Sequence, residues 1–407
     1  MKILFIGGYY PLGAENALLK DCKYGELSIP SNVYQWGVID GLLSNSVQLS
    51  LLSCPFLPAF PVGYKHLFTP QIDFIIDGRN VGVMKRFCDL ALVKPISRRR
   101  AFIKGISQWI ASEKIEKNER FAILSYSPSG DQIVPMVKLK KKYPNLITCC
   151  IITDLFQKTF ADTAKMPIFR RLQMCFEIYG LEKALSQIDK FVLLAKGMEE
   201  LVPETVNKNI IIEGIASEKP FYKKSDEESR IKTLLYTGSL GEHTSVKELI
   251  DAFMLTQSEN YRLCICGGGI YSDYIEECTK KDKRIEYLGV VPREQSIKLQ
   301  QSATVLINPR FPSIRDTPYS FPSKTMEYLT SGSPMIGFKL KGIPSEYYDY
   351  FYTVQEESIE SLSNTIDQVL SLSQIELNRK ALSAYCFIEN YKIAKAQMSK
   401  LLYFLNE

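Results

Sequence analysis

The sequence contains very little histidine, with only His66 and His243 among 407 residues. A zinc site built from imidazoles and a serine–histidine triad both need more histidine than this chain offers. Both histidines stand in loop-like surroundings, so we interpret them as surface residues. The composition therefore argues against both kinds of site.

Long apolar runs are also lacking. No run reaches the roughly 18 residues that a membrane-spanning helix needs, and the first residues do not form a signal peptide. The ten cysteines are scattered without the spacing of a metal site, so we interpret them as reduced core residues of a cytoplasmic protein. Any membrane contact is then peripheral, at the inner face of the plasma membrane.

Strong net charge is absent too, since the formal charge is only +5. By itself this modest charge argues neither for nor against nucleic acid. We expect no nucleic-acid partner. Basic residues do gather in the segment 85–110, where apolar residues lie among Arg98, Arg99, Arg100 and Lys104. This pattern is typical of a helix lying on an anionic membrane, and equally of an ordinary solvated helix face.

What the chain does have is two successive patterns of buried strands and helices, as expected for two domains in a chain of this length. The first strand, residues 1–8, ends in Gly7 and Gly8, which permit a tight turn close to a ligand. The following residues are not GxGxxG, so a nicotinamide site is weakly supported. Residues 55–81 are expected to be an irregular insertion that serves binding.

A strand over 120–126 runs into the loop Ser127 to Asp131. Ligands of open α/β sheets gather where strands end at their carboxyl side, which makes Asp131 a candidate site residue. Asp154 follows the next strand in the same way. Each of these acids is also a plausible turn or capping residue.

The second pattern begins after a polar linker. We expect an N-terminal domain over 1–216, a linker over 217–230, a second domain over 231–385, and a final segment over 386–407 whose helix crosses back to the first domain. The predicted fold class is α/β, with two Rossmann-like parallel-sheet domains and a ligand cleft between them.

The segment from Thr317 to Pro334 carries the clearest chemical signal. We expect Ser323 to cap a short helix that stops near Gly332. Free N–H groups at a helix start suit a phosphate, and Lys324 opposes the helix dipole there unless an anion offsets its charge. Glu327, one turn deeper, can accept hydrogen bonds from a sugar hydroxyl. An ordinary capped helix is the alternative interpretation.

The motifs TGSL (237–240), CGGG (266–269), INPR (307–310) and YSFPSKTMEYLTSGSP (319–334) resemble the donor half of glycosyltransferase family 4 enzymes, which have the GT-B fold. The resemblance is closest to bacterial members that assemble capsular polysaccharide or exopolysaccharide. It covers most of residues 232–350, while the first half of the chain matches only loosely.

The resemblance implies a retaining hexosyl transfer, without a metal, from a nucleotide-diphosphate sugar, with a UDP-sugar favoured. The acceptor would be a lipid-linked saccharide or an oligosaccharide held by the first domain. Glu327 would bond the ribose of the nucleotide, and Lys324 would contact the leaving diphosphate. The implied catalytic residues are Lys324, Glu327 and Asp131; the implied donor-binding residues are Gly7, Gly8, Gly238, Ser239, Leu240, Gly267, Gly268, Gly269, Val291, Arg310, Tyr319, Ser320, Phe321, Pro322 and Ser323.

Three positions depart from the family pattern. Tyr319 stands where the family has a glutamate, and Ser239 and Thr244 stand where it often has an arginine and a lysine. Lys247 or Lys324 could replace that lysine, with Arg310 or Arg315 acting from the other side. Asp131 or Asp154 could take the place of a missing first-domain histidine.

These departures leave two alternatives open. One is a GT-B-type sugar-nucleotide epimerase or hydrolase, which would need an acid–base set that the scarcity of histidine disfavours. The other is a non-catalytic subunit that binds a sugar nucleotide.

Overall fold

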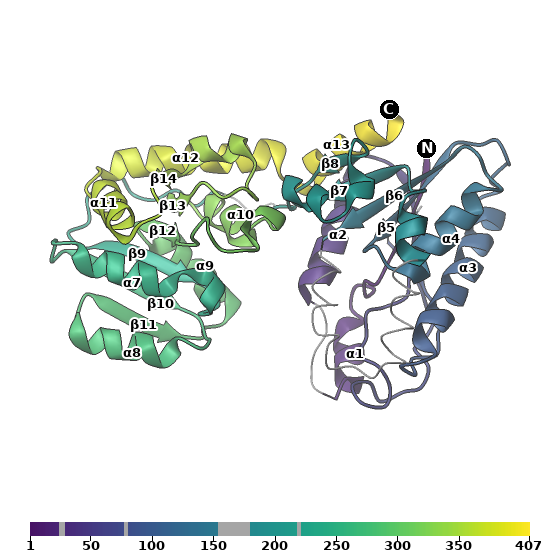
Figure 1. The fold of residues 1–407 in the computed structure, drawn as a ribbon, viewed down its shortest axis with the longest axis horizontal. Helices are drawn as coiled ribbons and strands as arrows, with labels where there is room; N and C mark the ends of the chain where they lie inside the picture. The colour runs from purple at the N-terminus through teal and green to yellow at the C-terminus, as the bar shows by residue number, and fades with distance from the viewer. Residues whose placement is uncertain (24–28, 77–79, 154–179, 218–220) are drawn as a thin grey trace. The chain divides into compact units, whose positions relative to one another are not determined.

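The computed structural model describes residues 1–23, 29–76, 80–153, 180–217 and 221–407 (Figure 1). The chain divides into two compact units. The first unit contains residues 1–194, 198–215 and 394–407, and the second contains residues 195–197 and 216–393. The chain thus returns to the first unit at Ala394, eight residues after the expected position 386. The candidate residue Asp154 lies outside the described residues.

The first unit contains an eight-stranded sheet of strand order β3-β4-β2-β1-β5-β6-β7-β8. All its neighbouring strands are parallel except β3 and β4, which are antiparallel. Their bounds are β1 Lys2–Gly7, β2 Gln48–Ser53, β3 Ile72–Ile75, β4 Val81–Met84, β5 Phe121–Tyr126, β6 Leu146–Ile152, β7 Lys190–Leu193 and β8 Asn209–Ile211.

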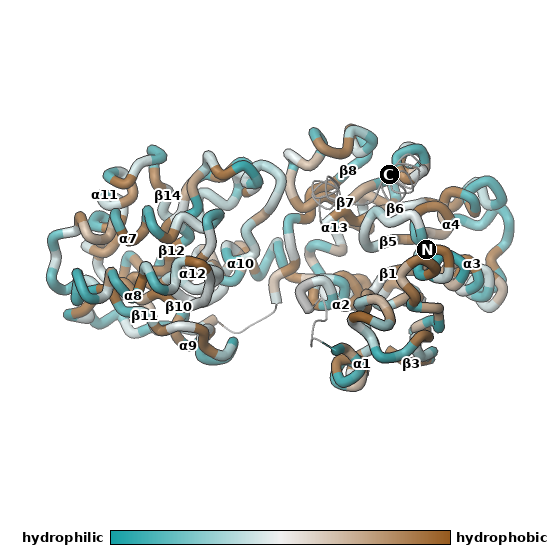
Figure 2. The backbone as a smooth tube through the Cα atoms, turned by 60° about the horizontal axis from the view of Figure 1, so that its bottom comes forward, coloured by the Kyte–Doolittle hydropathy of each residue, from teal (hydrophilic) through white to brown (hydrophobic). Residues whose placement is uncertain are grey.

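Helices cover both faces of this sheet, which explains why its inner strands are continuous apolar runs rather than alternating ones. All six residues of β5 are buried, and the central strands are brown in Figure 2. The helices are α1 Glu15–Asp21, α2 Ile29–Ser44, α3 Lys94–Ser112, α4 Gly130–Lys140 and α13 Ala394–Asn406. α2 packs against the C-terminal α13 on one face, and α3 packs beside α4 on the other.

The contact between α2 and α13 depends on close backbone approach. A Cβ atom at Gly41 would lie 2.3 Å from the carbonyl oxygen of Ala394. Met398, Leu401 and Leu405 of α13 are buried in the same cluster as the apolar face of α2. The last helix therefore belongs to the core of the first unit, as expected.

The insertion over 55–81 is not wholly irregular, which corrects the expectation for this segment. Residues 72–75 form β3, and β4 begins at Val81, so the two strands make an antiparallel extension of the sheet edge. β3 is only four residues long and alternates between half-buried and exposed positions. Such a short strand among prolines gives little sequence signal.

The second unit contains a six-stranded parallel sheet of order β11-β10-β9-β12-β13-β14. The strands are β9 Lys232–Thr237, β10 Tyr261–Cys266, β11 Ile285–Gly289, β12 Val305–Asn308, β13 Met335–Phe338 and β14 Tyr352–Val354. The helices are α7 Val246–Leu255, α8 Ser272–Lys281, α9 Arg293–Ser302, α10 Ser323–Leu329, α11 Ile359–Leu370 and α12 Gln374–Tyr391.

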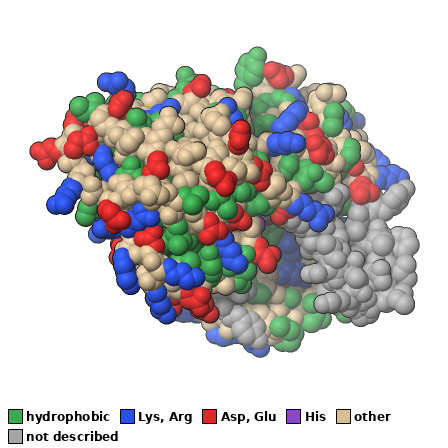
Figure 3. Space-filling view, turned by 60° about the vertical axis from the view of Figure 1, so that its left-hand side comes forward, with side chains coloured by type: hydrophobic (Ala, Val, Ile, Leu, Met, Phe, Trp, Pro, Cys, Tyr) green, Lys and Arg blue, Asp and Glu red, His purple; other side chains and the backbone are tan. Residues whose placement is uncertain are grey.

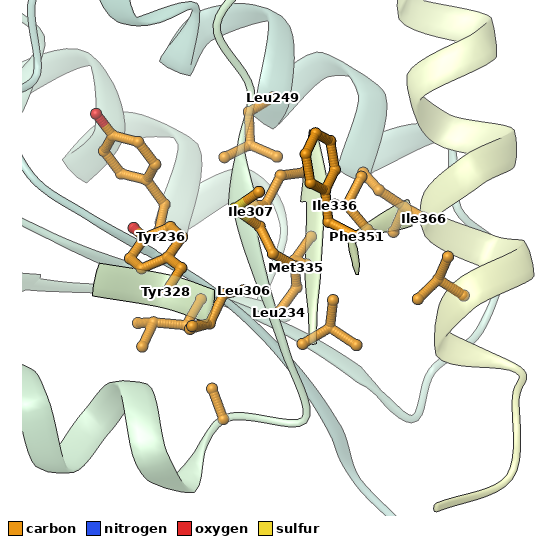
Figure 4. Packing of buried hydrophobic residues seen from close by; sticks show 14 of the residues in the cluster. Leu234, Tyr236, Leu249, Leu306, Ile307, Tyr328, Met335, Ile336, Phe351 and Ile366 are labelled. Carbon is orange, nitrogen blue, oxygen red and sulfur yellow. The ribbon is translucent and has the colours of Figure 1, made fainter. Parts of the chain in front are cut away.

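Counted along the chain, the strand order of this sheet is 3-2-1-4-5-6. The order reverses between β9 and β12, and ligands of such sheets bind at that switch point beyond the carboxyl ends of the strands. Figure 4 shows the core beneath it, where Leu306 and Ile307 of β12 pack among other aliphatic side chains. Tyr236 and Tyr328 lie at one side of this cluster.

Two surface features complete the description. No helix among the described residues is long and apolar enough to cross a membrane. On the face drawn in Figure 3, lysine and arginine side chains are interspersed with aspartate and glutamate, the pattern of a solvated surface.

Candidate functional site

The carboxyl ends of β9 and β10 continue into two glycine-bearing loops that lie backbone against backbone. The amide of Gly238 donates to the carbonyl of Cys266 at 2.8 Å, and the amide of Leu240 donates to that of Gly268 at 3.1 Å. Gly238 and Gly267 have φ angles of +144° and +148°. A Cβ atom at Gly267 would lie 1.7 Å from the Gly238 oxygen. Glycine is therefore required here by the contact between the loops themselves.

Lys324, in the first turn of α10, extends its amine over the first of these loops. A Cβ atom at Gly238 would lie 1.8 Å from Lys324 Nζ. The amine donates a 2.8 Å hydrogen bond to the hydroxyl of Tyr236 and lies 4.1 Å from the centre of that ring. Lys324 forms no ion pair with any described residue.

The electrostatic state of Lys324 follows from this position. Burial lowers the pKa of its amine to about 8, although the nearby Glu327 acts in the opposite direction. The amine is still mainly protonated at neutral pH, but its charge is poorly compensated by the protein. A half-buried cation of this kind favours an anionic ligand.

Tyr236 fixes the geometry of both Lys324 and the loop. Its hydroxyl accepts from Lys324 and donates to the carbonyl oxygen of Ser239 at 2.7 Å. Burial raises the pKa of this hydroxyl well above its ordinary value, so the phenol stays neutral. Tyr236 thus holds the loop after β9 at a fixed distance from the lysine.

Glu327 lies one turn further along α10 and is also held in place. Its Oε1 accepts a 2.6 Å hydrogen bond from Gln300 Nε2 of α9. The same Nε2 lies 3.1 Å from Thr237 Oγ1, and the amide of Thr237 donates to the hydroxyl of Tyr328 at 2.9 Å. This network ties the carboxylate to the end of β9. The second oxygen, Oε2, accepts no hydrogen bond from a described residue.

Arg310 supplies a second cation, just after β12. Its Nε is buried and has no hydrogen-bond partner among the described residues. Burial lowers the pKa of its guanidinium, an effect that Asp316 opposes. Arg310, like Lys324, forms no ion pair within the described chain. Because β9 and β12 are neighbours, both cations belong to the switch point.

The loop before α10 has a more structural character. The hydroxyl of Ser320 donates to the carbonyl of Asp316 at 2.9 Å. Phe321 is buried, with its ring 5.3 Å from that of Tyr347. Tyr319 ends the 3-10 helix η5, Thr317–Tyr319, and its amide bonds to Asp316.

The expected helix cap at Ser323 is wrong. Pro322 occupies the N-cap position, Ser323 is the first helical residue, and no side chain caps the helix. Pro322 is extended, with φ −71° and ψ 106°, so the helix begins one residue earlier than the capping pattern indicates.

Lys247, an alternative cation for the diphosphate, is engaged elsewhere. Its amine lies 4.4 Å from the ring centre of Tyr271 and 5.2 Å from that of Tyr274. Val291 lies in the loop that follows β11, next to Val290, whose side chain would be 2.8 Å from a Cβ atom at Gly268. Arg315 is exposed.

The remaining candidates lie in the first unit. The amide of Gly8 donates to Gln35 Oε1 at 2.9 Å, and a Cβ atom at Gly7 would lie 2.2 Å from that same oxygen. Asp131 is buried, and its Oδ2 lies 3.2 Å from Arg98 Nε, although the two atoms are not aligned as a hydrogen bond. The role of Asp131 in catalysis stays a prediction.

Sequence reasoning missed Tyr236 and Gln300. Tyr236 is the penultimate residue of an apolar strand, where a core role is the ordinary interpretation. Gln300 lies 27 residues before its partner Glu327, and only the packing of α9 against α10 brings the two side chains together. Neither residue belongs to a sequence motif, so no local signal marks it as a site residue.

Comparison with known structures identifies the class of fold. The sucrose-phosphate synthase of Thermosynechococcus elongatus is 12% identical, with a TM-score of 0.61 over 100% of this chain and 99% of that one. The lipopolysaccharide outer core galactosyltransferase WaaB is 14% identical, with a TM-score of 0.59 and the same coverage. Anabaena HepE in complex with UDP is 12% identical, with a TM-score of 0.55 over 99% and 100%. The chain therefore has the predicted α/β fold of the GT-B type.

A family model then places the second unit more closely. Residues 218–385 match the family Glycosyl transferases group 1. The match spans almost the whole second unit, including β9, β12 and α10. No curated protein matches the chain in sequence.

Proposed function

We propose that the protein is a glycosyltransferase that transfers a hexosyl group, with retention, from a nucleotide-diphosphate sugar, with a UDP-sugar favoured. The observation that carries the proposal is the position of Lys324. It is a half-buried cation without an anionic partner among the described residues, and it lies over the glycine loop at the switch point of the sheet that matches the family. The similarity to HepE in complex with UDP supports a uridine nucleotide.

Each of these residues has a separate role in the proposed transfer. Transfer from a diphosphate creates negative charge on the leaving group, and preorganised cations and N–H groups stabilise it. Lys324 and Arg310 supply the cations, on the two sides of the switch point. The free Oε2 of Glu327 accepts a hydrogen bond from the ribose, while Gln300 fixes the carboxylate. These residues need no metal ion to balance the diphosphate, and the transfer is proposed to proceed without one.

The acceptor is proposed to be a lipid-linked saccharide in cell-surface polysaccharide synthesis, of the capsular or exopolysaccharide kind. Support comes from the start of α3, where Leu92, Val93 and Ile96 are exposed to 70%, 42% and 55%. Arg100 and Lys104, also exposed, lie close by in the same helix. Exposed apolar side chains beside cations are typical of contact with an anionic membrane.

The helix α3 also has a buried apolar face, formed by Phe102, Ile106, Trp109 and Ile110. That face packs inside the first unit, so the membrane contact is limited to the first two turns and the loop before them. Replacing Leu92 and Ile96 with serine should reduce sedimentation with phosphatidylglycerol vesicles. Serine at the exposed Val62, outside this segment, is the control, and equal sedimentation of both proteins would contradict the contact.

One experiment separates the proposed activity from its alternatives. The protein is first titrated with UDP, GDP, ADP and CDP by calorimetry, and then incubated with the matching sugar nucleotides and a lipid-linked saccharide. Sugar appearing on the acceptor supports the transferase. Conversion of the nucleotide sugar without acceptor indicates an epimerase or hydrolase, and binding alone indicates a non-catalytic subunit. No binding of any nucleotide would overturn the donor site.

A further inference from the structure

The segment 221–224, which precedes β9, lies against the turn between α10 and β13. Gly332 in this turn has a φ angle of +87°, and a Cβ atom there would lie 2.3 Å from the carbonyl oxygen of Tyr222. Glycine permits both the left-handed backbone and this close approach. The segment also falls within the match to the glycosyltransferase family, which starts at residue 218. It is therefore a packed part of the second unit.

Lys224 extends from this segment to the C-terminal end of α9. Its amine donates to the carbonyl oxygen of Ala303 and to Ser333 Oγ, and it forms no ion pair with any described residue. The last carbonyls of a helix have no amide partner within the helix, and a lysine there satisfies them and complements the helix dipole. Burial lowers the pKa of this amine to about 8. Because the neutral amine still donates hydrogen bonds, the contact does not depend on the charge.

Ser333 continues the contact towards the donor site. Its side chain is buried, with 1% exposed, and its Oγ lies 2.6 Å from the carbonyl oxygen of Gln300 and 3.0 Å from that of Ala303. The side chain of the same Gln300 donates at 2.6 Å to Glu327 Oε1, the carboxylate proposed above to bind the ribose. Lys224, Ser333 and Gln300 thus form a continuous path of hydrogen bonds that ends at Glu327.

We propose that Lys224 and Ser333 are positioning residues of the donor site, which hold the end of α9 so that Gln300 keeps Glu327 in place for the ribose. A side chain supported by a connected network is fixed more narrowly than one held by a single hydrogen bond. Neither residue contacts the nucleotide itself. The inference rests on the proposed function, because it assigns both residues a role in nucleotide binding.

A purely structural role for Lys224 predicts a different result. If the lysine only fastened its segment to the second unit, its loss would not distinguish between ligands. Because we infer that it acts through Glu327, its loss should weaken a ligand that contains ribose and spare one that does not. The ribose contact is made in the bound substrate as well as during transfer, so the KM for the donor should rise while kcat stays nearly constant.

Calorimetry with UDP and with inorganic diphosphate tests this path. Lys224→Met keeps the apolar part of the side chain and removes the donor, so it should weaken UDP binding about threefold and leave diphosphate binding unchanged. Ser333→Ala, which interrupts the same path, should act in the same direction. Lys223→Met, at an exposed lysine of the same segment, is the control and should bind both ligands like the unmodified protein.

The double variant Lys224→Met/Glu327→Gln tests whether Lys224 acts through Glu327. It should bind UDP like Glu327→Gln alone to within about 1.5-fold, whereas independent losses would weaken binding about threefold further. Independent losses, an equal loss for diphosphate, or unchanged UDP affinity in both Lys224→Met and Ser333→Ala would overturn the inference, while UDP binding by the unmodified protein would preserve the donor site. No UDP binding by the unmodified protein would overturn both.

Discussion

The two sheets treat buried cations near their carboxyl edges differently. In the first unit, Arg98 lies 3.2 Å from Asp131, and Lys94 lies 2.7 Å from the buried Asp89. In the second unit, Lys324 and Arg310 form no ion pair with any described residue. At the edge of the first sheet, which we call the closed edge, the cations are paired with carboxylates of the same chain. At the edge of the second sheet, the open edge, the cations are available to an external anion. This difference supports the proposed donor site more strongly than the glycine loops do.

The physical reason lies in desolvation. Burial lowers the pKa of a cation, and a carboxylate in contact opposes that shift, as Asp89 does for Lys94, whose pKa is nevertheless lowered. Burial lowers the pKa of Lys324 to about 8, and Glu327, which is not in ion-pair contact, opposes the shift only in part. A bound diphosphate would supply the missing negative charge. The desolvation cost that the cation carries in the free protein is then offset in the complex, which favours binding.

The largest expected effect comes from opening the closed edge. Asp131→Asn leaves Arg98 buried without a counter-charge and should lower the free energy of unfolding by about 3 kcal/mol. Urea denaturation measures this. Asp73→Asn, at an exposed carboxylate, should change it by less than about 0.5 kcal/mol. Equal stability of the two variants would remove the distinction between the edges.

The next effect concerns the open edge and has the opposite sign for stability. Lys324→Met should weaken UDP binding at least about tenfold, or about 1.4 kcal/mol, and lower turnover. It should also raise the free energy of unfolding by about 1 kcal/mol, because a desolvated charge is removed. Calorimetry and urea denaturation measure the two. Lys247→Met is the control. If Lys247→Met lost as much UDP affinity as Lys324→Met, the assignment of the diphosphate site to Lys324 would be wrong.

A pH titration sharpens the assignment without disturbing the fold. The folded pKa of Lys324 is lowered to about 8, so the charged amine is present below that pH and is lost above it. UDP affinity should therefore fall severalfold between about pH 7 and about pH 9.5. In Lys324→Arg the guanidinium stays charged throughout, and affinity should be flat over this range. A fall of the same size in the arginine variant would exclude Lys324 as its cause.

The smallest effect is expected at Glu327. Glu327→Gln keeps the shape of the side chain but weakens the acceptor offered to the ribose, and UDP affinity should fall about threefold to tenfold. Inorganic diphosphate, which has neither ribose nor uracil, should bind Glu327→Gln and the unmodified protein alike. An equal loss for diphosphate would show that Glu327 acts through Lys324 instead.

Much of the second unit could be predicted from the sequence. Apolar runs that end in glycine or asparagine predict strands over 232–236, 261–266 and 304–308, and β9, β10 and β12 lie within one residue of these bounds. In the first unit, β3 was missed because four half-exposed residues carry no such signal. The helix cap at Ser323 was misplaced because a capping pattern does not reveal the conformation of Pro322.

The sequence by itself determined the two α/β patterns, the glycines of the loops and the candidacy of Lys324 and Glu327, since these depend on residues adjacent in the chain. Only the tertiary structure decided which charges are compensated. Lys324 meets Tyr236 across 88 residues, and Gln300 reaches Glu327 across 27. Burial and pairing are properties of the packed chain, so the pKa of Lys324, and with it the case for an anion site, could come only from the fold.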